Sequence, residues 1–102
     1  MWAQMITMHL KPGKEEGLEQ LIAQLRAAEQ SGSGLVHSTV ARDTKDPSRV
    51  ITLVVFESEE KARERETDSR RQEGLEAVRA TTMEIFEGVP EFMDLTVVDD
   101  WS

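Results

Sequence analysis

Residues 49–62, RVITLVVFESEEKA, decide the fold, because a continuous run of strand-forming side chains leads directly into a charged helical segment. The β-branched and aromatic residues from Val50 to Phe56 would point to both faces of an extended strand. Neither face can be left to water, so both have to be covered. Ser58 suits the N-cap of the following helix, because its hydroxyl can accept a hydrogen bond from a free backbone N–H of the first turn. The stretch therefore predicts a central strand followed by a helix.

Three further strands are expected around this centre. Side chains alternate over residues 2–10 and 35–42 in the period of two that is typical of strands. The segment 43–48 consists of turn-forming residues and is short enough to join the second strand to the central one as an antiparallel hairpin. Residues 92–98 are expected to form the last strand.

Two helical regions are expected between the strands. The first begins near residue 13 or 14 and carries one apolar stripe at helical spacing, formed by Leu18, Leu21, Ile22, Leu25 and Ala28. The second begins after Ser58. The segment 67–69 is expected to divide it into two pieces, with Ser69 capping the second piece. Gly88-Val89-Pro90 is expected to end that piece.

The order β-α-β-β-α-β predicts an α+β domain of the ferredoxin-like type, with one four-stranded antiparallel sheet and the helices on a single face. A chain of 102 residues has room for one domain, so residues 1–102 are interpreted as a single unit. The other face of the sheet is left bare, although the central strand is apolar on both sides. Apolar patches of that size are rare on monomers, so we expect a homodimer that packs sheet against sheet.

The composition argues against several function classes. Twenty acidic and twelve basic residues give a net charge of −8, which opposes binding to nucleic acid and to anionic membrane surfaces. The chain contains no cysteine, which excludes disulfides, thiolate metal sites and cysteine nucleophiles. Residues 1–10 have neither the basic lead-in nor the length of a signal peptide or membrane span, so a cytoplasmic protein is expected.

Four stretches, taken with the order of elements, resemble one family: KPGKEEGLEQLI (11–22), RDTKDPSRV (42–50), VVFESEEKA (54–62) and EGVPEFMDLTVV (87–98). They resemble the antibiotic biosynthesis monooxygenase domain of the dimeric α/β-barrel superfamily, over nearly the whole chain. The resemblance implies a cavity between the sheet and its helices, and a dimer whose sheets close a barrel. Members of this group include oxygenases of polyketide-like aromatics that use neither metal nor flavin, haem-degrading enzymes, and small proteins with no assigned activity.

The resemblance also points to particular positions. Phe56 stands just before the Glu-Ser of the strand-to-helix junction, where such enzymes carry an aromatic pocket residue that is often Trp. The haem-degrading branch needs an Asn in the first strand, where this chain has Ile6, and a His ligand in the second helical region. Residues 58–87 contain no histidine, so haem degradation is disfavoured.

Strand parity predicts which side chains would line a cavity between the sheet and its helices. If Leu10 packs on the first helix, the candidate binding residues on its face are Trp2, Gln4, Ser38, Arg42, Thr52 and Phe56. A few polar groups among methionine and aromatic walls would suit a planar apolar ligand that carries carbonyl or hydroxyl groups. The alternative is that these are ordinary core and rim residues, with Arg42 a solvated charge beside Asp43.

His9 and His37 have the opposite parity and are expected in the barrel interior or at the dimer interface. Each is a conceivable base, because histidine titrates near neutral pH unaided, and a hydrogen-bonded interface residue is the other interpretation. No ligand spacing that includes Asp99 and Asp100 supports a metal site. The alternating charges of residues 64–73 are typical of a solvated helix face, with an arginine gate to an anionic ligand as the alternative.

The function that the resemblance implies is a cofactor-independent monooxygenase of a small aromatic or quinone-like substrate of the polyketide type. Such an enzyme positions or deprotonates an electron-rich phenol, stabilises the anion, and admits O₂ to a dry pocket. Arg42 or Gln4 would stabilise that anion, while no base is identifiable. The alternative is a non-catalytic homodimer, ligand-binding or stress-associated, that uses the same cavity without turnover. A purely structural partner protein is a third possibility.

Overall fold

The computed structural model describes residues 1–101. The elements in chain order are β1 (Trp2–Leu10), α1 (Glu15–Ala28), β2 (Leu35–Arg42), β3 (Arg49–Phe56), α2 (Glu59–Glu66), the 3₁₀ turn η1 (Ser69–Arg71), α3 (Gln72–Ile85) and β4 (Phe86–Thr96). The predicted order is confirmed, with the second helical region divided into α2, η1 and α3.

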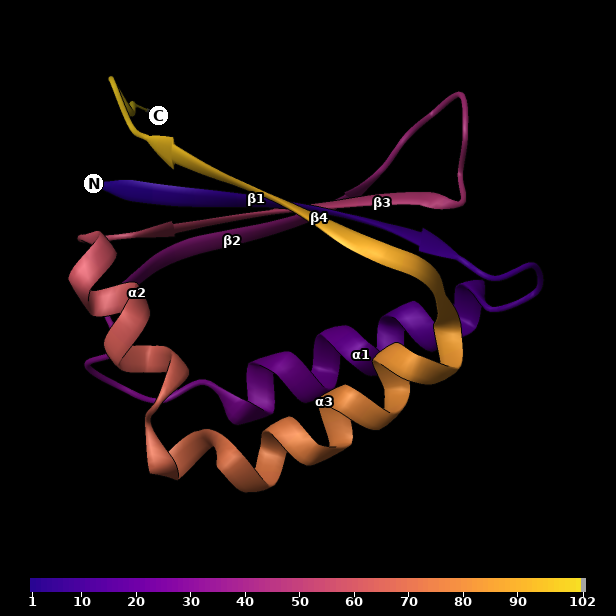
Figure 1. Ribbon diagram of the computed structural model, residues 1–102, viewed down its shortest axis with the longest axis horizontal. Coiled ribbons are helices and arrows are strands. Elements are labelled where there is room, and N and C mark those ends of the chain that lie inside the picture. Colours follow the sequence, from indigo (N-terminus) through magenta and orange to yellow (C-terminus); the bar gives the residue numbers. More distant parts are fainter. Residues whose placement is uncertain (102) are drawn as a thin grey trace.

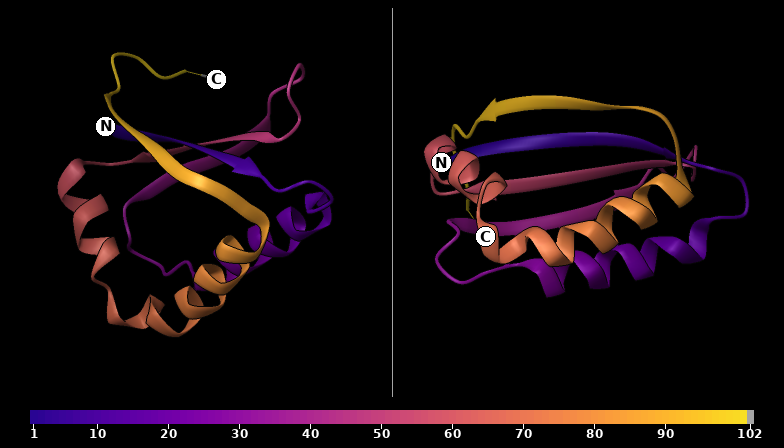
Figure 2. Two further views of the ribbon diagram at one scale, coloured as in Figure 1. Left: turned by 45° about the vertical axis from the view of Figure 1, so that its right-hand side comes forward. Right: turned by 60° about the horizontal axis from the view of Figure 1, so that its bottom comes forward.

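The four strands form one antiparallel sheet in the order β2-β3-β1-β4, which is the ferredoxin-like arrangement. Helices α1 and α3 lie side by side against one face of this sheet (Figures 1 and 2). Helix α2 descends from the end of β3 at one end of the sheet and leads toward α3 (Figure 1). The central position predicted for residues 49–56 is confirmed, because β3 has a strand on each side.

The register between β1 and β3 determines which side chains face the helices. Trp2 lies opposite Phe56, and Ile6 lies opposite Thr52. All four side chains line the space between the sheet and the helices. The parity predicted for these two strands is therefore confirmed.

The hydrophobic core joins the two layers where β1 ends and β4 begins. It is formed by Leu10, Val50 and Phe86 of the sheet and by Leu18, Leu21 and Ile85 of the helices. The stripe predicted for α1 is confirmed, because Leu18, Leu21 and Ala28 are buried and Ile22 and Leu25 pack partly buried against the core. Removal of these apolar surfaces from water holds the helices on the sheet.

Two glycines allow α1 and α3 to approach each other closely. A Cβ atom added at Gly17 would lie 2.4 Å from the Cγ2 atom of Ile85. One added at Gly74 would lie 2.9 Å from the Cβ atom and 3.2 Å from the Cα atom of Ala28. The Ala28 atoms belong to the backbone or are attached to it directly, so they cannot move aside unless the helices separate.

We therefore expect Gly74→Ala to lower the free energy of unfolding by about 1–3 kcal/mol, as overpacking does. This loss opposes the helix propensity of alanine, which exceeds that of glycine by roughly 1 kcal/mol. Urea unfolding followed by circular dichroism measures the change, with Glu76→Ala at an exposed position of α3 as the control. A variant as stable as the wild type would show that a methyl group at this position fits between α1 and α3 without overpacking.

The start of the last strand differs from the prediction. Helix α3 ends at Ile85, and β4 begins at Phe86 rather than at residue 92. Phe86 adopts an extended conformation (φ −109°, ψ 150°), and its side chain is buried in the core. Gly88 and Pro90 were expected to separate helix from strand, but they lie inside β4. This is possible because β4 is an edge strand, where proline costs no ladder hydrogen bond.

A β-bulge in β2 corrects the predicted face of Leu35. Leu35 pairs with Phe56, whereas the next pair joins His37 to Val55, so Val36 is an extra residue in the strand. Alternation predicts Leu35 on the same face as His37. Leu35 lines the space beneath the sheet instead, because the bulge reverses the parity of the residues before it.

The caps of the second helical region agree in part with the prediction. The Ser58 hydroxyl accepts a hydrogen bond from the backbone N–H of Lys61 at 3.1 Å, which confirms it as the N-cap of α2. The break at residues 67–69 is also confirmed, but the capping residue is Asp68 and not Ser69. The Asp68 carboxylate accepts a hydrogen bond from the Arg70 backbone at 2.9 Å. Hydrogen bonds from the Arg70 side chain and backbone lower the pKa of Asp68 to about 2.

The sheet face turned away from the helices, here called the outer face, is apolar and only partly covered. Its side chains include Met5, Ile51, Leu53, Met93 and Leu95. The residues after β4 reach this face at one end, where Asp100 Oδ2 lies 4.0 Å from His37 Nε2. Ala3 and Val55, in the same row of the sheet as His37, are buried, whereas Met93 is 53% exposed.

Candidate functional site

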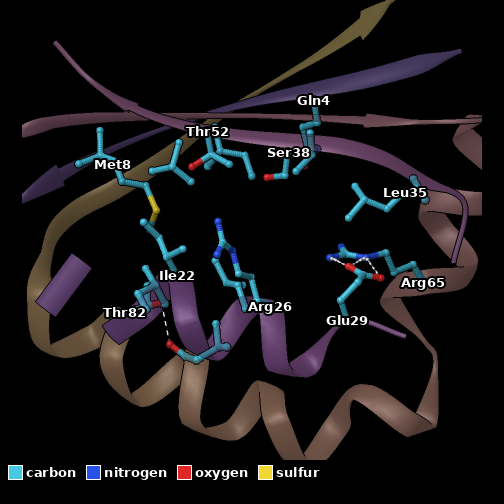
Figure 3. Close-up of a pocket in the computed structure, with 18 of the residues that line it drawn as sticks. Gln4, Met8, Ile22, Arg26, Glu29, Leu35, Ser38, Thr52, Arg65 and Thr82 are labelled. Carbon is cyan, nitrogen blue, oxygen red and sulfur yellow. Dashed lines mark hydrogen bonds and ion pairs between the residues drawn. The ribbon is translucent and has the colours of Figure 1, made fainter. Parts of the chain in front are cut away.

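A cavity of about 810 Å³ lies between the sheet and the helices. The helix-facing side chains of the strands form its roof, and α1, α2 and α3 form its floor and one end (Figure 3). Apolar side chains make up most of the wall, and the space stays open although Trp2, Met8 and Phe56 all project toward it. The volume lies in the range of sites that hold small molecules.

Most of the predicted binding residues meet in this cavity. Those that line it are Trp2, Gln4, Ser38, Thr52 and Phe56. The polar side chains among them come from three neighbouring strands and point from the sheet into the space (Figure 3). Strand parity therefore located the polar groups of the roof correctly.

Arg42 is the exception among the predicted binding residues. It shares the parity of Ser38, but it is the last residue of β2 and lies beyond the cavity, near Glu15 and Glu16 at the start of α1. Its Nε donates a hydrogen bond to the Pro47 carbonyl at 2.8 Å. The proposal that Arg42 stabilises a bound anion is therefore not supported by its position.

Trp2 and Phe56 form the aromatic end of the cavity. Their ring centroids are 6.1 Å apart, and the ring planes are inclined by 42°. The guanidinium of Arg63 lies 5.3 Å from the centroid of Trp2, and that of Arg65 lies 5.3 Å from the centroid of Phe56. A cation over the face of an aromatic ring is attracted by the negative charge density of that face. Both rings are thus held by cations of α2.

Asp94 of β4 connects the roof of the cavity to α2. Its Oδ1 accepts a hydrogen bond from Gln4 Nε2 at 3.0 Å, and its Oδ2 lies 3.6 Å from Nη2 of Arg63. The amide group of Gln4 is therefore oriented by a charged acceptor. Its remaining N–H and its carbonyl oxygen are the groups available to a ligand.

Arg65 and Glu29 form an ion pair at the floor of the aromatic end. Arg65 Nη2 lies 2.7 Å and its Nε 3.0 Å from Glu29 Oε2 (Figure 3). The side chains are 17% and 24% exposed. Burial by itself raises the pKa of Glu29, but the hydrogen bonds and charge of Arg65 outweigh burial and hold the pKa below its ordinary value. Glu29 is therefore ionised at neutral pH.

Arg71 lies behind Arg65 and is almost fully buried, with 5% of its surface exposed. Its Nη1 donates a hydrogen bond to the Arg65 carbonyl at 3.1 Å, while its Nε is buried and has no partner among residues 1–101. Burial lowers the pKa of the Arg71 guanidinium, and the positive charge of Arg65 lowers it further.

For the arginines of this end, sequence reasoning preferred a solvated helix face over residues 64–73 and kept an arginine gate to an anionic ligand as the alternative. That interpretation fits Glu64, Glu66 and Arg70, which are exposed, but not Arg65 and Arg71. A signal was present, because Ala62 is the single apolar residue of α2 and is buried, and Arg65 lies three positions later on the same face of the helix. Arg26 of α1 also points into the cavity (Figure 3).

The two histidines lie away from the cavity. His9 and His37 belong to the outer face, as their parity predicts, and His37 faces Asp100. Within residues 1–101 no three histidine, aspartate or glutamate side chains are grouped closely enough to hold a metal ion. In the same part of the chain, no helix is long and apolar enough to cross a membrane.

Solved structures similar to this fold include three that span almost the whole chain. A candidate antibiotic biosynthesis monooxygenase from Chloroflexus aurantiacus J-10-fl is 22% identical, with 99% of this chain and 96% of that chain covered and a TM-score of 0.73. One from Caulobacter crescentus CB15 is 16% identical, with coverage of 96% and 90% and a TM-score of 0.78. SnoaB, a cofactor-independent oxygenase from Streptomyces nogalater solved in mutant form, is 15% identical, with coverage of 97% and 94% and a TM-score of 0.73.

These identities are low, so the structural likeness shows the fold and not the reaction. No curated protein matches the sequence. The sequence model of one family, described as antibiotic biosynthesis monooxygenase, does match, and it covers residues 1–77. That range contains the cavity residues of β1, β2 and β3 as well as the arginines of α1, α2 and η1. The chain belongs to the antibiotic biosynthesis monooxygenase family.

Proposed function

We propose that this protein is a monooxygenase that binds a small aromatic or quinone-like molecule in the cavity and oxidises it with O₂ alone, without metal or flavin. The cavity carries this proposal, because it combines apolar walls with a few converging polar groups. Family membership supports a monooxygenase-like role, and SnoaB is a cofactor-independent oxygenase of the same fold. The proposal treats residues 1–102 as one cytoplasmic domain.

The reaction that fits such a site converts a ring CH₂ group, activated by a phenolate, into a carbonyl. One atom of O₂ becomes the carbonyl oxygen and the other leaves as water with the two hydrogens, so O₂ takes four electrons from the carbon. The protein holds the ring between the sheet and the helices and excludes bulk water. The roof groups of Gln4 and Thr52, with the guanidinium of Arg26 opposite them, stabilise the phenolate oxygen.

Oxygen uptake tests this function. With anthrone-like phenols as substrates, we expect O₂ consumption above the spontaneous rate, and about a tenfold to hundredfold lower kcat/KM in Gln4→Ala and Thr52→Val, which each remove one polar group. Arg42→Ala is the control, because Arg42 lies outside the cavity. No uptake by the wild type, or equal rates in all variants, would refute the oxygenase.

A non-catalytic ligand-binding or stress-associated protein is the second candidate. One observation favours it: the cavity wall formed by the described residues includes neither of the two histidines. A ligand that co-purifies in native mass spectrometry and stays unchanged in the presence of O₂ would support binding without turnover.

Homodimerisation through the outer face is part of the proposal. The support is the apolar row of Met5, Leu53 and Met93 across three neighbouring strands, on a face that no helix of residues 1–101 covers (Figure 2). A surface of this kind is typical of protein–protein interfaces. Two copies packed sheet against sheet would bury it and place each cavity on the far side of its own sheet.

A further inference from the structure

The cavity concentrates positive charge in a protein that is otherwise strongly acidic. The chain has a net charge of −8, yet its charged cavity residues are Arg26, Arg65, Arg71, Glu29 and Glu66. Both carboxylates are already paired. Glu66 lies 3.2 Å from Arg63, which is not a lining residue of the cavity, and Glu29 pairs with Arg65. Among residues 1–101, Arg26 and Arg71 have no carboxylate within 4.0 Å.

In the described part of the chain, Arg71 is a buried cation with an unpaired guanidinium nitrogen, and the charges of Glu29, Asp68 and Glu66 act on it only from beyond ion-pair distance. It is nearly inaccessible, and one guanidinium nitrogen bonds to the Arg65 carbonyl while Nε bonds to nothing in residues 1–101. Buried donors are almost always satisfied in native proteins, and an unsatisfied one indicates a missing partner. A cationic donor is best satisfied by an anionic oxygen.

The Glu29–Arg65 pair shows what fits at this position. Both oxygens of a carboxylate already accept hydrogen bonds here, Oε1 from Nε of Arg65 at 3.3 Å and Oε2 from Nη2 at 2.7 Å, in the fork geometry that arginine uses for carboxylate ligands. The guanidinium of the same arginine lies over the ring of Phe56. An anion-binding group and an aromatic wall are therefore adjacent at this end of the cavity.

We propose that the Arg65–Arg71 end of the cavity is an anion subsite, which binds the carboxylate of an otherwise apolar aromatic ligand. The ligand class of this cavity is then an aromatic acid. The carboxylate takes its hydrogen bonds from Arg65 and Arg71, displacing Glu29 from Arg65, and the rings extend beneath Gln4, Ser38 and Thr52. This inference rests on the proposed function only in using the same cavity.

Paired probes test the subsite in the whole protein. Isothermal titration calorimetry with 2-naphthoate and with its methyl ester compares two ligands that differ in charge and share the ring system. We expect the acid to bind wild-type protein at least about tenfold more tightly than the ester, because charge-assisted hydrogen bonds are the strong ones. Equal affinities, a tighter ester, or no saturable binding of the acid at millimolar concentration would overturn the proposal.

Variants then assign the preference to residues. Arg65→Met and Arg71→Met should each reduce the acid-to-ester ratio toward one, whereas Glu29→Gln should raise it, because the neutral amide competes less well for Arg65. Arg79→Met, at an exposed position of α3, is the matched control and should keep the wild-type ratio. If Arg71→Met does not fold, Arg65→Met and Glu29→Gln still decide, and an unchanged ratio in both would overturn the assignment.

Two further measurements distinguish the anion subsite from a general anion site and from the oxygenase activity. Inorganic phosphate at the same concentration should not displace 2-naphthoate, and equal competition would show a general anion site instead of an aromatic-acid site. Binding is measured without O₂ uptake, so an acid preference without turnover supports the subsite and refutes the oxygenase. Turnover of neutral phenols without an acid preference supports the oxygenase and refutes the subsite.

Discussion

Leu53→Glu is expected to convert the proposed homodimer into a monomer at micromolar concentration. Leu53 lies at the centre of the outer face, opposite Met5 on β1 and Thr39 on β2. A two-fold symmetric interface contains the substitution twice, once from each subunit. Two carboxylates would therefore be buried in the same interface, away from water. Burial of unpaired charge costs several kcal/mol, and each 1.4 kcal/mol is a factor of ten, so the dissociation constant should rise by roughly a thousandfold or more.

Sedimentation velocity across a range of concentrations measures this change. Met83→Glu is the matched control, because Met83 is 77% exposed on α3, in the helical layer away from the outer face. It should sediment as the wild type does, and circular dichroism should show that both variants are folded. A wild-type monomer, or a Leu53→Glu dimer of unchanged strength, would contradict packing through the outer face.

Arg65→Met is expected to lower the free energy of unfolding at pH 7 by about 2–3 kcal/mol, because it leaves the carboxylate of Glu29 partly buried without its cationic partner. Methionine keeps much of the apolar contact with Phe56 and so isolates the loss of charge. Arg79→Met is the control for the loss of an exposed arginine. A loss equal to that of the control would mean that the ion pair contributes nothing to stability.

The same pair makes a pH-dependent contribution whose sign follows from Glu29. In the wild type its pKa lies below the ordinary value of 4.5, so the stabilisation is present above that pH and is lost as the pH falls through the folded-state pKa. Without the hydrogen bonds and charge of Arg65, the pKa of Glu29 is higher than in the wild type, so protonation of Glu29 removes the unpaired charge of the variant at a higher pH. The difference in unfolding free energy should therefore shrink between pH 7 and pH 4, as measured by urea unfolding at both values. A constant difference would exclude Glu29 as its cause.

The elements of the fold could be read from local patterns because those patterns depend on near neighbours in the chain. Period-two alternation placed Gln4 and Thr52 on the helix-facing side, and helical spacing identified the stripe that includes Leu21. Where a tertiary contact competes, these rules fail. Burial of Phe86 in the core starts β4 before the glycine and proline that were expected to end the helix, and one extra residue at Val36 reverses the face of Leu35.

The features of the candidate site also fall into two groups, those predicted from local patterns and those placed by tertiary contacts. The sequence by itself determined the sheet, the faces of its central strands, the polar roof of the cavity and the family resemblance, because each of these follows from side chains a few positions apart. Only the tertiary structure decided that Arg42 lies outside the cavity and that Arg65 and Arg71 lie inside it. Burial of a charged side chain depends on which distant segment covers it, here the end of α1 with Glu29, whereas the spacing of Arg65 from Ala62 indicates only the face of the helix.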